Sequence, residues 1–158
     1  MRIANLQIDN FRGVKTGFIQ FGRHPVLVGD NNTGKTTLVE ALTLVLGRDR
    51  LVRELTEHDF FGSNPQAADR IKVVATVTDF PGDDPEQSSQ WFRDERAVVK
   101  WLDEATGHVH PLRTNPAWKL CCQLGVQARF DQDSLAVETV RYFYDHDEPI
   151  DPFADEAP

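Results

Sequence analysis

The chain has 158 residues, of which 40% are apolar and 9% aromatic, and its formal net charge is −8. These values allow one domain with a hydrophobic core, and no stretch approaches the roughly 20 apolar residues of a membrane-spanning helix. The N-terminus lacks the apolar core of a signal peptide and the only two cysteines, Cys121 and Cys122, are adjacent, which excludes a disulfide framework and favours a cytoplasmic protein.

Three strands are predicted at the start of the chain. Apolar residues mark strands over residues 2–8 and 16–21, and residues 10–13 form the turn between them. The short apolar run at residues 25–28 is typical of a fully buried parallel strand, and it ends at Gly29.

A phosphate-binding motif follows the third strand. Residues 29–37 match G-x-x-x-x-G-K-[ST], the P-loop, in which the two glycines let successive N–H groups turn inward. Lys35 supplies a mobile charge for the β- and γ-phosphates, and the Thr36 hydroxyl is placed to bind Mg²⁺. The residues predicted from this pattern are Gly29, Gly34, Lys35, Thr36 and Thr37.

The P-loop leads into a predicted helix over residues 35–46. Apolar residues at helical spacing form one continuous face, made of Leu38, Ala41, Leu42, Val45 and Leu46. Gly47 stands where a left-handed C-cap is expected. The motif therefore has the strand before it and the helix after it that a P-loop requires.

The rest of the body alternates between helical and strand patterns. The expected elements are a helix over 51–58, a half-buried strand over 70–79, a helix over 86–105, and a hairpin made of strands 119–130 and 135–144 with a turn at 131–134. One face of the hairpin is polar and should meet water. This order differs from the regular strand–helix alternation of a doubly wound domain.

The last residues differ in composition from the body. Residues 145–158 carry six acidic residues and three prolines but no lysine or arginine. Without these six acidic residues, the 17 basic residues of the chain face 19 acidic ones, so the body is nearly neutral at −2. We therefore expect one domain over residues 1–144, followed by an acidic tail that is a linker or disordered.

Several of these patterns resemble one family. They are Asn10-Phe11-Arg12-Gly13, then Val26-Leu27-Val28 before the P-loop, and Leu38-x-Glu40-Ala41-Leu42 after it. Together they look like the N-terminal part of an ABC-type ATPase head of the SMC, RecF and RecN branch. Within this branch, residues 55–61 (Leu-Thr-Glu-His-Asp-Phe-Phe) and the strand after them resemble the OLD (overcoming lysogenization defect) family of ATP-dependent endonucleases.

The resemblance implies a mixed α/β fold of the α+β type: the N-terminal lobe of a P-loop head with an antiparallel β-subdomain. It implies that ATP and Mg²⁺ are bound, with Asn31, Asn32 and Thr33 also wrapping the triphosphate. Arg12 would approach the nucleotide, or else is a surface turn residue. The implied partners are the remainder of the head, a Toprim nuclease domain, a second head on dimerisation, and DNA through other domains, without a membrane. Nucleotide binding would then regulate DNA cleavage in the full-length protein.

Other motifs of this branch are missing from the sequence. Hydrolysis needs an apolar strand ending in Asp-Glu and an LSGGQ-like signature, and the nuclease needs a Toprim cluster; none is found. Asp79 and Asp145 end strands without a following Glu, so both are better interpreted as turn residues. Gln123 or Gln127 could be the lid glutamine that senses Mg²⁺, although the wet face of the hairpin also explains them. The chain is predicted to be incomplete for hydrolysis, and whether it is an enzyme by itself stays open.

Other functions remain as alternatives. The chain could be a head fragment of another SMC- or RecF-like DNA-repair ATPase, or a non-enzymatic module for oligomerisation or DNA docking, against which the near-neutral body argues modestly. A nucleotide kinase or GTPase lacks its arginine-rich lid or Asn-Lys-x-Asp motif. A zinc site is disfavoured, because its histidines fit a loop before Pro111; its residues would be His108, His110, Cys121 and Cys122.

Overall fold

The computed structural model describes residues 1–30, 34–47, 54–145 and 151–153. Within these residues the strands are β1 (Arg2–Phe11), β2 (Val14–Gln20), β3 (Arg70–Thr78), β4 (Lys100–Leu102), β5 (Val109–His110), β6 (Lys119–Asp131) and β7 (Ala136–Phe143). The helices are α1 (Lys35–Leu46) and α2 (Ser89–Phe92), with short 3₁₀ turns at Glu57–Asp59, Pro81–Asp83, Glu86–Ser88 and Arg93–Glu95. Strands and helices are therefore mixed, as the sequence predicts.

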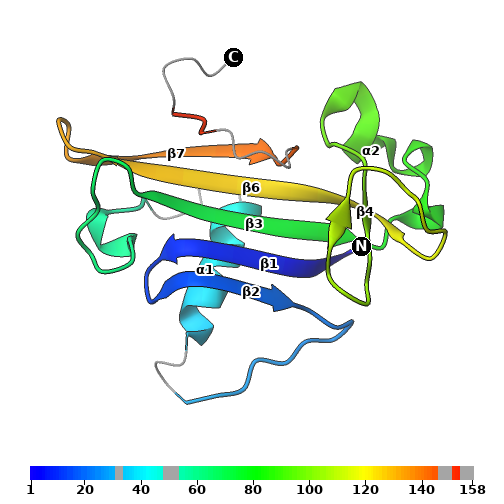
Figure 1. Cartoon of the computed structure of the whole chain (residues 1–158), viewed down its shortest axis with the longest axis horizontal. Coiled ribbons are helices and arrows are strands. Elements are labelled where there is room, and N and C mark those ends of the chain that lie inside the picture. The colour runs from blue at the N-terminus through cyan, green and yellow to red at the C-terminus, as the bar shows by residue number, and fades with distance from the viewer. Residues whose placement is uncertain (31–33, 48–53, 146–150, 154–158) are drawn as a thin grey trace.

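All the described strands belong to one antiparallel sheet (Figure 1). Its order is β2-β1-β3-β6-β4-β5, and β7 pairs with the part of β6 that β4 does not reach. The longest strand is β6, with 13 residues, and it joins β3, β4 and β7. The predicted hairpin is confirmed, because β6 and β7 pair from Asp131 and Ala136 to Leu124 and Phe143.

Helix α1 packs against one face of the sheet, which we call the helix face (Figure 1). The buried residues of α1 are Leu38, Ala41, Leu44 and Val45, and they meet Leu6, Ile8, Phe11, Ile71, Val73, Ala75, Val126 and Ala128 from the sheet. The predicted apolar stripe is wrong at one end of the helix, since Leu46 is 41% exposed and Leu44 is buried. The buried arc of α1 is centred on Ala41, which turns Leu44 inward and Leu46 outward.

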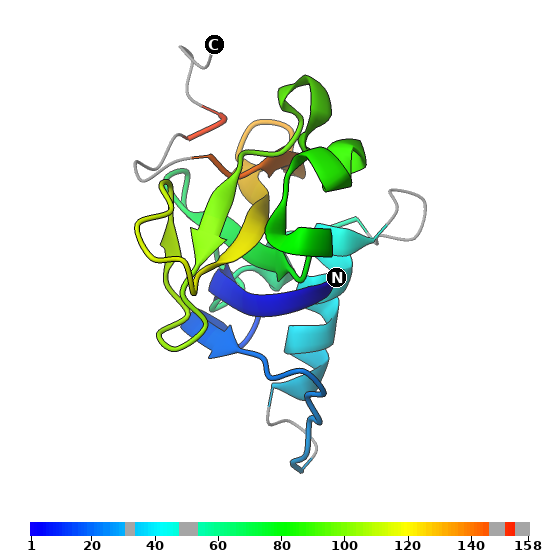
Figure 2. The same ribbon diagram turned by 90° about the vertical axis from the view of Figure 1, so that its right-hand side faces the viewer.

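The end of the sheet that holds β4 and β5, with its loops up to residue 118, curls over part of the opposite face, which we call the open face (Figure 2). Strand β3 is buried on both faces, so the expectation of a half-buried strand is wrong. Thr76 and Thr78 lie on the open face with no exposed surface. The Thr78 hydroxyl donates a hydrogen bond of 2.8 Å to the carbonyl oxygen of Leu120. A threonine whose hydroxyl group is hydrogen-bonded in this way can be buried. The polar residues at alternate positions of β3 therefore suggested a wet face, although the strand lies in the middle of the sheet.

The buried parallel strand predicted at residues 25–28 is not present. This segment pairs with none of the described strands, and Val26 and Val28 are 81% and 88% exposed. A buried parallel strand needs a strand to pair with and a cover on both faces. The described strands all belong to the antiparallel sheet, so three consecutive apolar residues lie on the surface beside the P-loop.

The helix predicted over residues 86–105 is also wrong. The chain forms two 3₁₀ turns and the four-residue helix α2, and then enters the sheet as β4. Asp94 has a φ of 56°, which a continuous helix does not allow. Trp91 and Phe92 pack edge-to-face on Phe80, with ring centroids 5.8 and 5.0 Å apart. Tertiary packing and strand pairing therefore outweigh the helical spacing of a few residues.

Two smaller expectations also differ from the structure. Of the helix predicted over residues 51–58, residues 51–53 lie outside the described residues, and the described part forms only the 3₁₀ turn Glu57–Asp59. Gly47 has φ −67° and ψ 152°, so it is not a left-handed cap. Its carbonyl oxygen instead accepts a hydrogen bond of 2.8 Å from Arg141 of β7, which ties the end of α1 to the hairpin.

Candidate nucleotide-binding site

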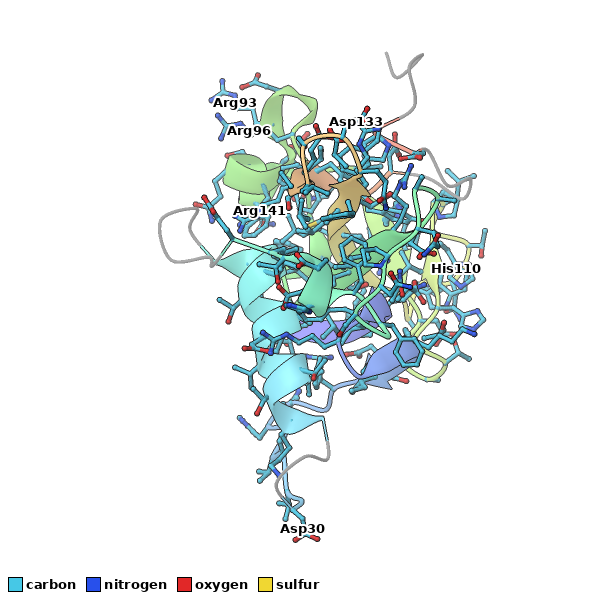
Figure 3. All side chains as sticks on the ribbon, turned by 90° about the vertical axis from the view of Figure 1, so that its left-hand side faces the viewer. Asp30, Arg93, Arg96, His110, Asp133 and Arg141 are labelled. Carbon is cyan, nitrogen blue, oxygen red and sulfur yellow. The ribbon has the colours of Figure 1, made fainter. Side chains whose placement is uncertain are left out.

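The chain leaves the sheet at the end of β2, and residues 21–28 separate that strand from the start of the P-loop at Gly29. The last residues of the P-loop begin α1. Figure 3 shows Asp30 at the tip of this loop, beyond the N-terminal end of α1 and away from the sheet. Among the predicted site residues, the structure describes Gly29, Gly34, Lys35, Thr36 and Thr37. Asn31, Asn32 and Thr33 lie outside the described residues.

Gly34 forms the N-cap of α1 in a left-handed conformation, with φ 85° and ψ 1°. Any other L-residue is strained there, so the backbone itself requires this glycine. The Gly34 carbonyl oxygen accepts a hydrogen bond of 3.0 Å from the N–H of Leu38, which starts the helix. Gly34 offers no side chain to cap α1, and the first turn of α1 has no acidic residue. This helix end therefore suits an external anion.

Lys35 and Thr36 are the first two residues of α1. The Lys35 ammonium contacts the carbonyl oxygens of Gly29 and Asp30, so its side chain folds back over the loop. Thr36 is exposed and Thr37 is half-buried. An ammonium group, a helix N-terminus and an adjacent hydroxyl are the donors that a triphosphate and its Mg²⁺ require, so the residues present fit this ligand.

Arg12, in the turn between β1 and β2, contacts two carboxylates. Its Nε donates to Oδ1 of Asp59 over 3.0 Å, and its guanidinium also contacts the carboxylate of Glu40 in α1. The backbone N–H of Arg12 donates to the carbonyl oxygen of Asp59 over 2.7 Å. In this structure Arg12 therefore joins the turn to α1 and to Glu57–Asp59, and its approach to a nucleotide stays a prediction.

Glu40 and Asp59 are partners of Arg12 that motif reasoning missed. The Asp59 side chain is only 3% exposed, and its Oδ2 accepts a hydrogen bond of 2.9 Å from the N–H of Thr56. Both residues stand within the patterns that resemble the ABC-type heads, which was the available signal. Their pairing with Arg12 could not be read from spacing, because Arg12 and Asp59 are 47 positions apart.

The candidate lid glutamines lie on the open face, on the side of β6 opposite α1. Gln123 accepts a hydrogen bond of 3.0 Å from Lys100, and Gln127 donates one of 3.0 Å to the hydroxyl of Tyr142. Asp79, which directly follows β3, accepts a hydrogen bond of 3.1 Å from Arg2 of β1. Asp145 lines a cavity of about 520 Å³ on the open face. A Mg²⁺-sensing role for either glutamine stays a prediction.

The residues considered for zinc have other surroundings. His110 stacks on Trp118 at a centroid distance of 4.0 Å. Cys121 and Cys122 are free thiols, and burial raises the pKa of Cys122 to about 12 and also raises the pKa of Cys121. Zinc binds thiolates, so protonated, buried thiols are poor ligands. In the described part of the chain, no group of three or more His, Cys, Asp or Glu side chains is placed to hold a metal.

Comparisons with known proteins identify the family. A profile described as "AAA ATPase domain" matches residues 1–131. The chain belongs to this AAA ATPase domain family. The matched residues include both the P-loop and most of the antiparallel sheet.

Curated relatives support an ATPase domain of the SMC- and RecF-like type. The DNA replication and repair protein RecF of Allorhizobium ampelinum is 31% identical over 125 residues, which cover 73% of this chain and 33% of that protein. The RecF proteins of Rhizobium johnstonii and Agrobacterium fabrum are each 30% identical, with the same shares covered. The chain therefore spans about a third of the length of the curated relatives that it matches.

The structure also bears on the membrane. Among the described residues, no helix is both long enough and apolar enough to cross a bilayer.

Proposed function

We propose that this chain is the ATP-binding part of an ABC-type ATPase head, in which its P-loop forms half of the catalytic site. The observation that carries the proposal is the start of α1, where left-handed Gly34 precedes Lys35 and Thr36 at an uncapped helix end. The family adds ATPase character, and relatives named for DNA replication and repair favour a role in DNA maintenance.

The remainder of the site is proposed to come from another part of a larger head. Val26, Leu27 and Val28 are 81%, 46% and 88% exposed, and on the outward side of α1 Val39 and Leu46 are 52% and 41% exposed. A helix that is apolar on two sides is normally buried on both, and exposed apolar patches mark interfaces. Further strands would cover these residues and bring the Asp-Glu carboxylates that the chain lacks.

In this arrangement the chain holds the nucleotide and does not cleave it. Backbone N–H groups of residues 29–37 and the Lys35 ammonium would bind the phosphate oxygens, and Thr36 would hold Mg²⁺. Bound Mg²⁺ supplies charge neutralisation for phosphoryl transfer. Activation of water would depend on a carboxylate from the remainder of the head, and head-to-head dimerisation would complete the site.

A narrower form of the proposal concerns an endonuclease. Residues 55–61 resemble the OLD family, and in this fold Asp59 and Phe60 attach that segment to Arg12 and Phe11. In an OLD-like protein, ATP-dependent closure of two heads would regulate a Toprim nuclease domain and its contact with DNA. The RecF relatives favour a DNA-repair ATPase instead. Reading the gene beyond codon 158 for a Walker-B-like strand and a Toprim pattern distinguishes the two.

The test of ATP binding is Lys35→Ala, with Lys15→Ala as the matched control on exposed β2. We expect Lys35→Ala to weaken binding of a fluorescent ATP analogue by about tenfold or more, because a charge-assisted phosphate contact is lost. Lys15→Ala should bind as the unchanged chain does. Circular dichroism should show that both variants are folded. Unchanged affinity in folded Lys35→Ala would refute the P-loop assignment.

The same variants test whether the chain is catalytically incomplete. The 158-residue chain should release no more phosphate from ATP than Lys35→Ala does. Robust turnover that Lys35→Ala abolishes would mean that the chain itself carries the water-activating carboxylate.

A further inference from the structure

The acidic tail predicted to be a linker or disordered makes specific contacts in its described part. Residues 151–153 lie above the hairpin edge of the sheet, where they form the red segment in Figure 1. They contact Arg70 at the start of β3 and Arg129 near the end of β6. These two residues face each other in the register of β3 and β6, on the open face, and we call them the arginine pair.

Each arginine binds a different part of the segment. Nε and Nη2 of Arg70 donate to the Asp151 carboxylate over 3.2 and 2.9 Å. Nη1 of Arg129 donates to the carbonyl oxygen of Phe153 over 3.2 Å. Both guanidinium groups also lie over the Phe153 ring, at 5.7 Å for Arg70 and 5.0 Å for Arg129. The site therefore contacts a carboxylate, a peptide carbonyl and an aromatic ring together.

The arginine pair is held in place by the fold. Nη1 of Arg70 donates to the carbonyl oxygens of Ala67 and Asp69 over 2.8 and 2.9 Å, and the remaining donors of Arg70 point at Asp151. Arg129 Nε donates to Glu138 over 2.6 Å. Side chains fixed in this way lose less freedom when they bind a ligand.

The segment is also organised before it docks. Oδ1 of Asp151 accepts a hydrogen bond of 3.0 Å from the N–H of Phe153, which closes a turn around Pro152. Proline restricts its own φ and the residue before it, so few other conformations compete. The same carboxylate thus shapes the turn and binds Arg70.

We propose that the arginine pair is a receptor for a short acidic–aromatic peptide of the form Asp-Pro-Phe, which this chain supplies to itself through residues 151–153. The hydrogen bond from Arg129 to the Phe153 carbonyl oxygen favours a peptide over a nucleic acid as the ligand, because its acceptor belongs to a peptide backbone. Docking holds residues 151–153 against the ends of β3 and β6. The receptor lies opposite α1, so it neither needs nor tests nucleotide binding.

The experiment uses the full 158-residue chain carrying Asp151→Asn and Phe153→Ala, which releases the segment. A fluorescein-labelled peptide with the sequence of residues 149–156 is titrated and its anisotropy is measured. We expect the released chain to bind the peptide about fivefold tighter than the unchanged chain, whose own segment competes at high effective concentration. Equal affinity for the two chains would overturn the proposal.

Matched variants distinguish specific binding by the arginine pair from attraction of an acidic peptide to any positive charge. In the released chain, Arg70→Gln should weaken peptide binding about fivefold or more, whereas Arg113→Gln, at an exposed arginine outside these contacts, should not. Peptides with Asn for Asp151 or Ala for Phe153 should bind the released chain as weakly as the original peptide binds its Arg70→Gln variant. Because only the peptide changes, this comparison does not depend on the folding of a new protein variant. Unchanged binding of either peptide would contradict the assigned contacts. Tighter binding of a ten-nucleotide single-stranded DNA, lost with Arg70→Gln, would assign the pair to nucleic acid instead.

Discussion

At the scale of single residues, Arg12 shows how one side chain serves the fold beside the P-loop. Its φ is 50°, a conformation that costs energy for any residue except glycine. Contacts with Glu40 and Asp59 hold it there, and Asp59 is almost fully buried. A nucleotide that drew Arg12 away would have to compete with two carboxylates.

Arg12→Gln should therefore destabilise the chain. We expect a loss of about 2–3 kcal/mol in the free energy of unfolding, because the buried Asp59 carboxylate loses its charged partner. Urea denaturation followed by tryptophan fluorescence measures this loss. Arg23→Gln, at an exposed arginine, should change stability little. Adding Asp59→Asn to Arg12→Gln should restore part of the lost stability. If the effects of the two single substitutions on the free energy of unfolding simply add in the double variant, the ion pair is unimportant.

At the scale of elements, the hairpin of β6 and β7 depends on a glycine that its alternation did not mark. Gly125 faces Tyr142, and a Cβ added at Gly125 would lie 2.7 Å from the Tyr142 ring. Tyr142 accepts a hydrogen bond from Gln127 on the same face. The small residue thus lets the ring lie flat across β6 on the open face.

Gly125→Ala should destabilise the chain by about 1–3 kcal/mol, since the Tyr142 ring must move and lose its bond to Gln127. Thermal unfolding measures the effect. Gly13→Ala is the matched control, because a Cβ there meets nothing within 4 Å. In a Tyr142→Ala background, Gly125→Ala should cost much less. An equal cost in both backgrounds would trace the effect to the backbone and not to the ring.

At the scale of the whole molecule, hydrogen-bonded acids and buried thiols predict a loss of stability at low pH and at high pH, respectively. The pKa of Asp151 is lowered mainly by its hydrogen bond to Arg70, that of Asp103 by the N–H of Ala105, and that of Asp131 by the N–H of Asp133. The pKa values of Cys121 and Cys122 are raised by burial. Carboxylates and thiols therefore titrate differently in the folded and unfolded chains.

The melting temperature should fall on both sides of neutrality. A carboxyl with a lowered pKa stabilises the fold above its unfolded value, about 4, and this is lost as pH falls further. A thiol with a raised pKa stabilises below its unfolded value, about 8.5, and this is lost as pH rises toward the folded value. Calorimetry from pH 3 to 10 measures both limbs. With both cysteines changed to alanine the alkaline limb should shrink; an unchanged limb would exclude the thiols as its cause.

The local features of this protein can be predicted from its sequence. Helix α1, the first two strands and the β6–β7 hairpin follow from short-range patterns, because turn residues and periods of 2 and 3.6 act over a few residues. The P-loop assignment comes from its sequence motif and stays a prediction. The ATPase family followed from the same short segments, and the comparisons support it. The finer prediction of an OLD endonuclease rests on the sequence resemblance alone.

Which segments pair with one another depends on the tertiary structure. Lys100–Leu102 became a strand because β6 offered an edge, and residues 25–28 formed no strand because no described strand lies beside them. The pairings of Arg12 with Asp59 and of Arg70 with Asp151 join residues 47 and 81 positions apart. Strand pairing and ion pairs depend on distance in space, which the periodicity of a sequence does not encode.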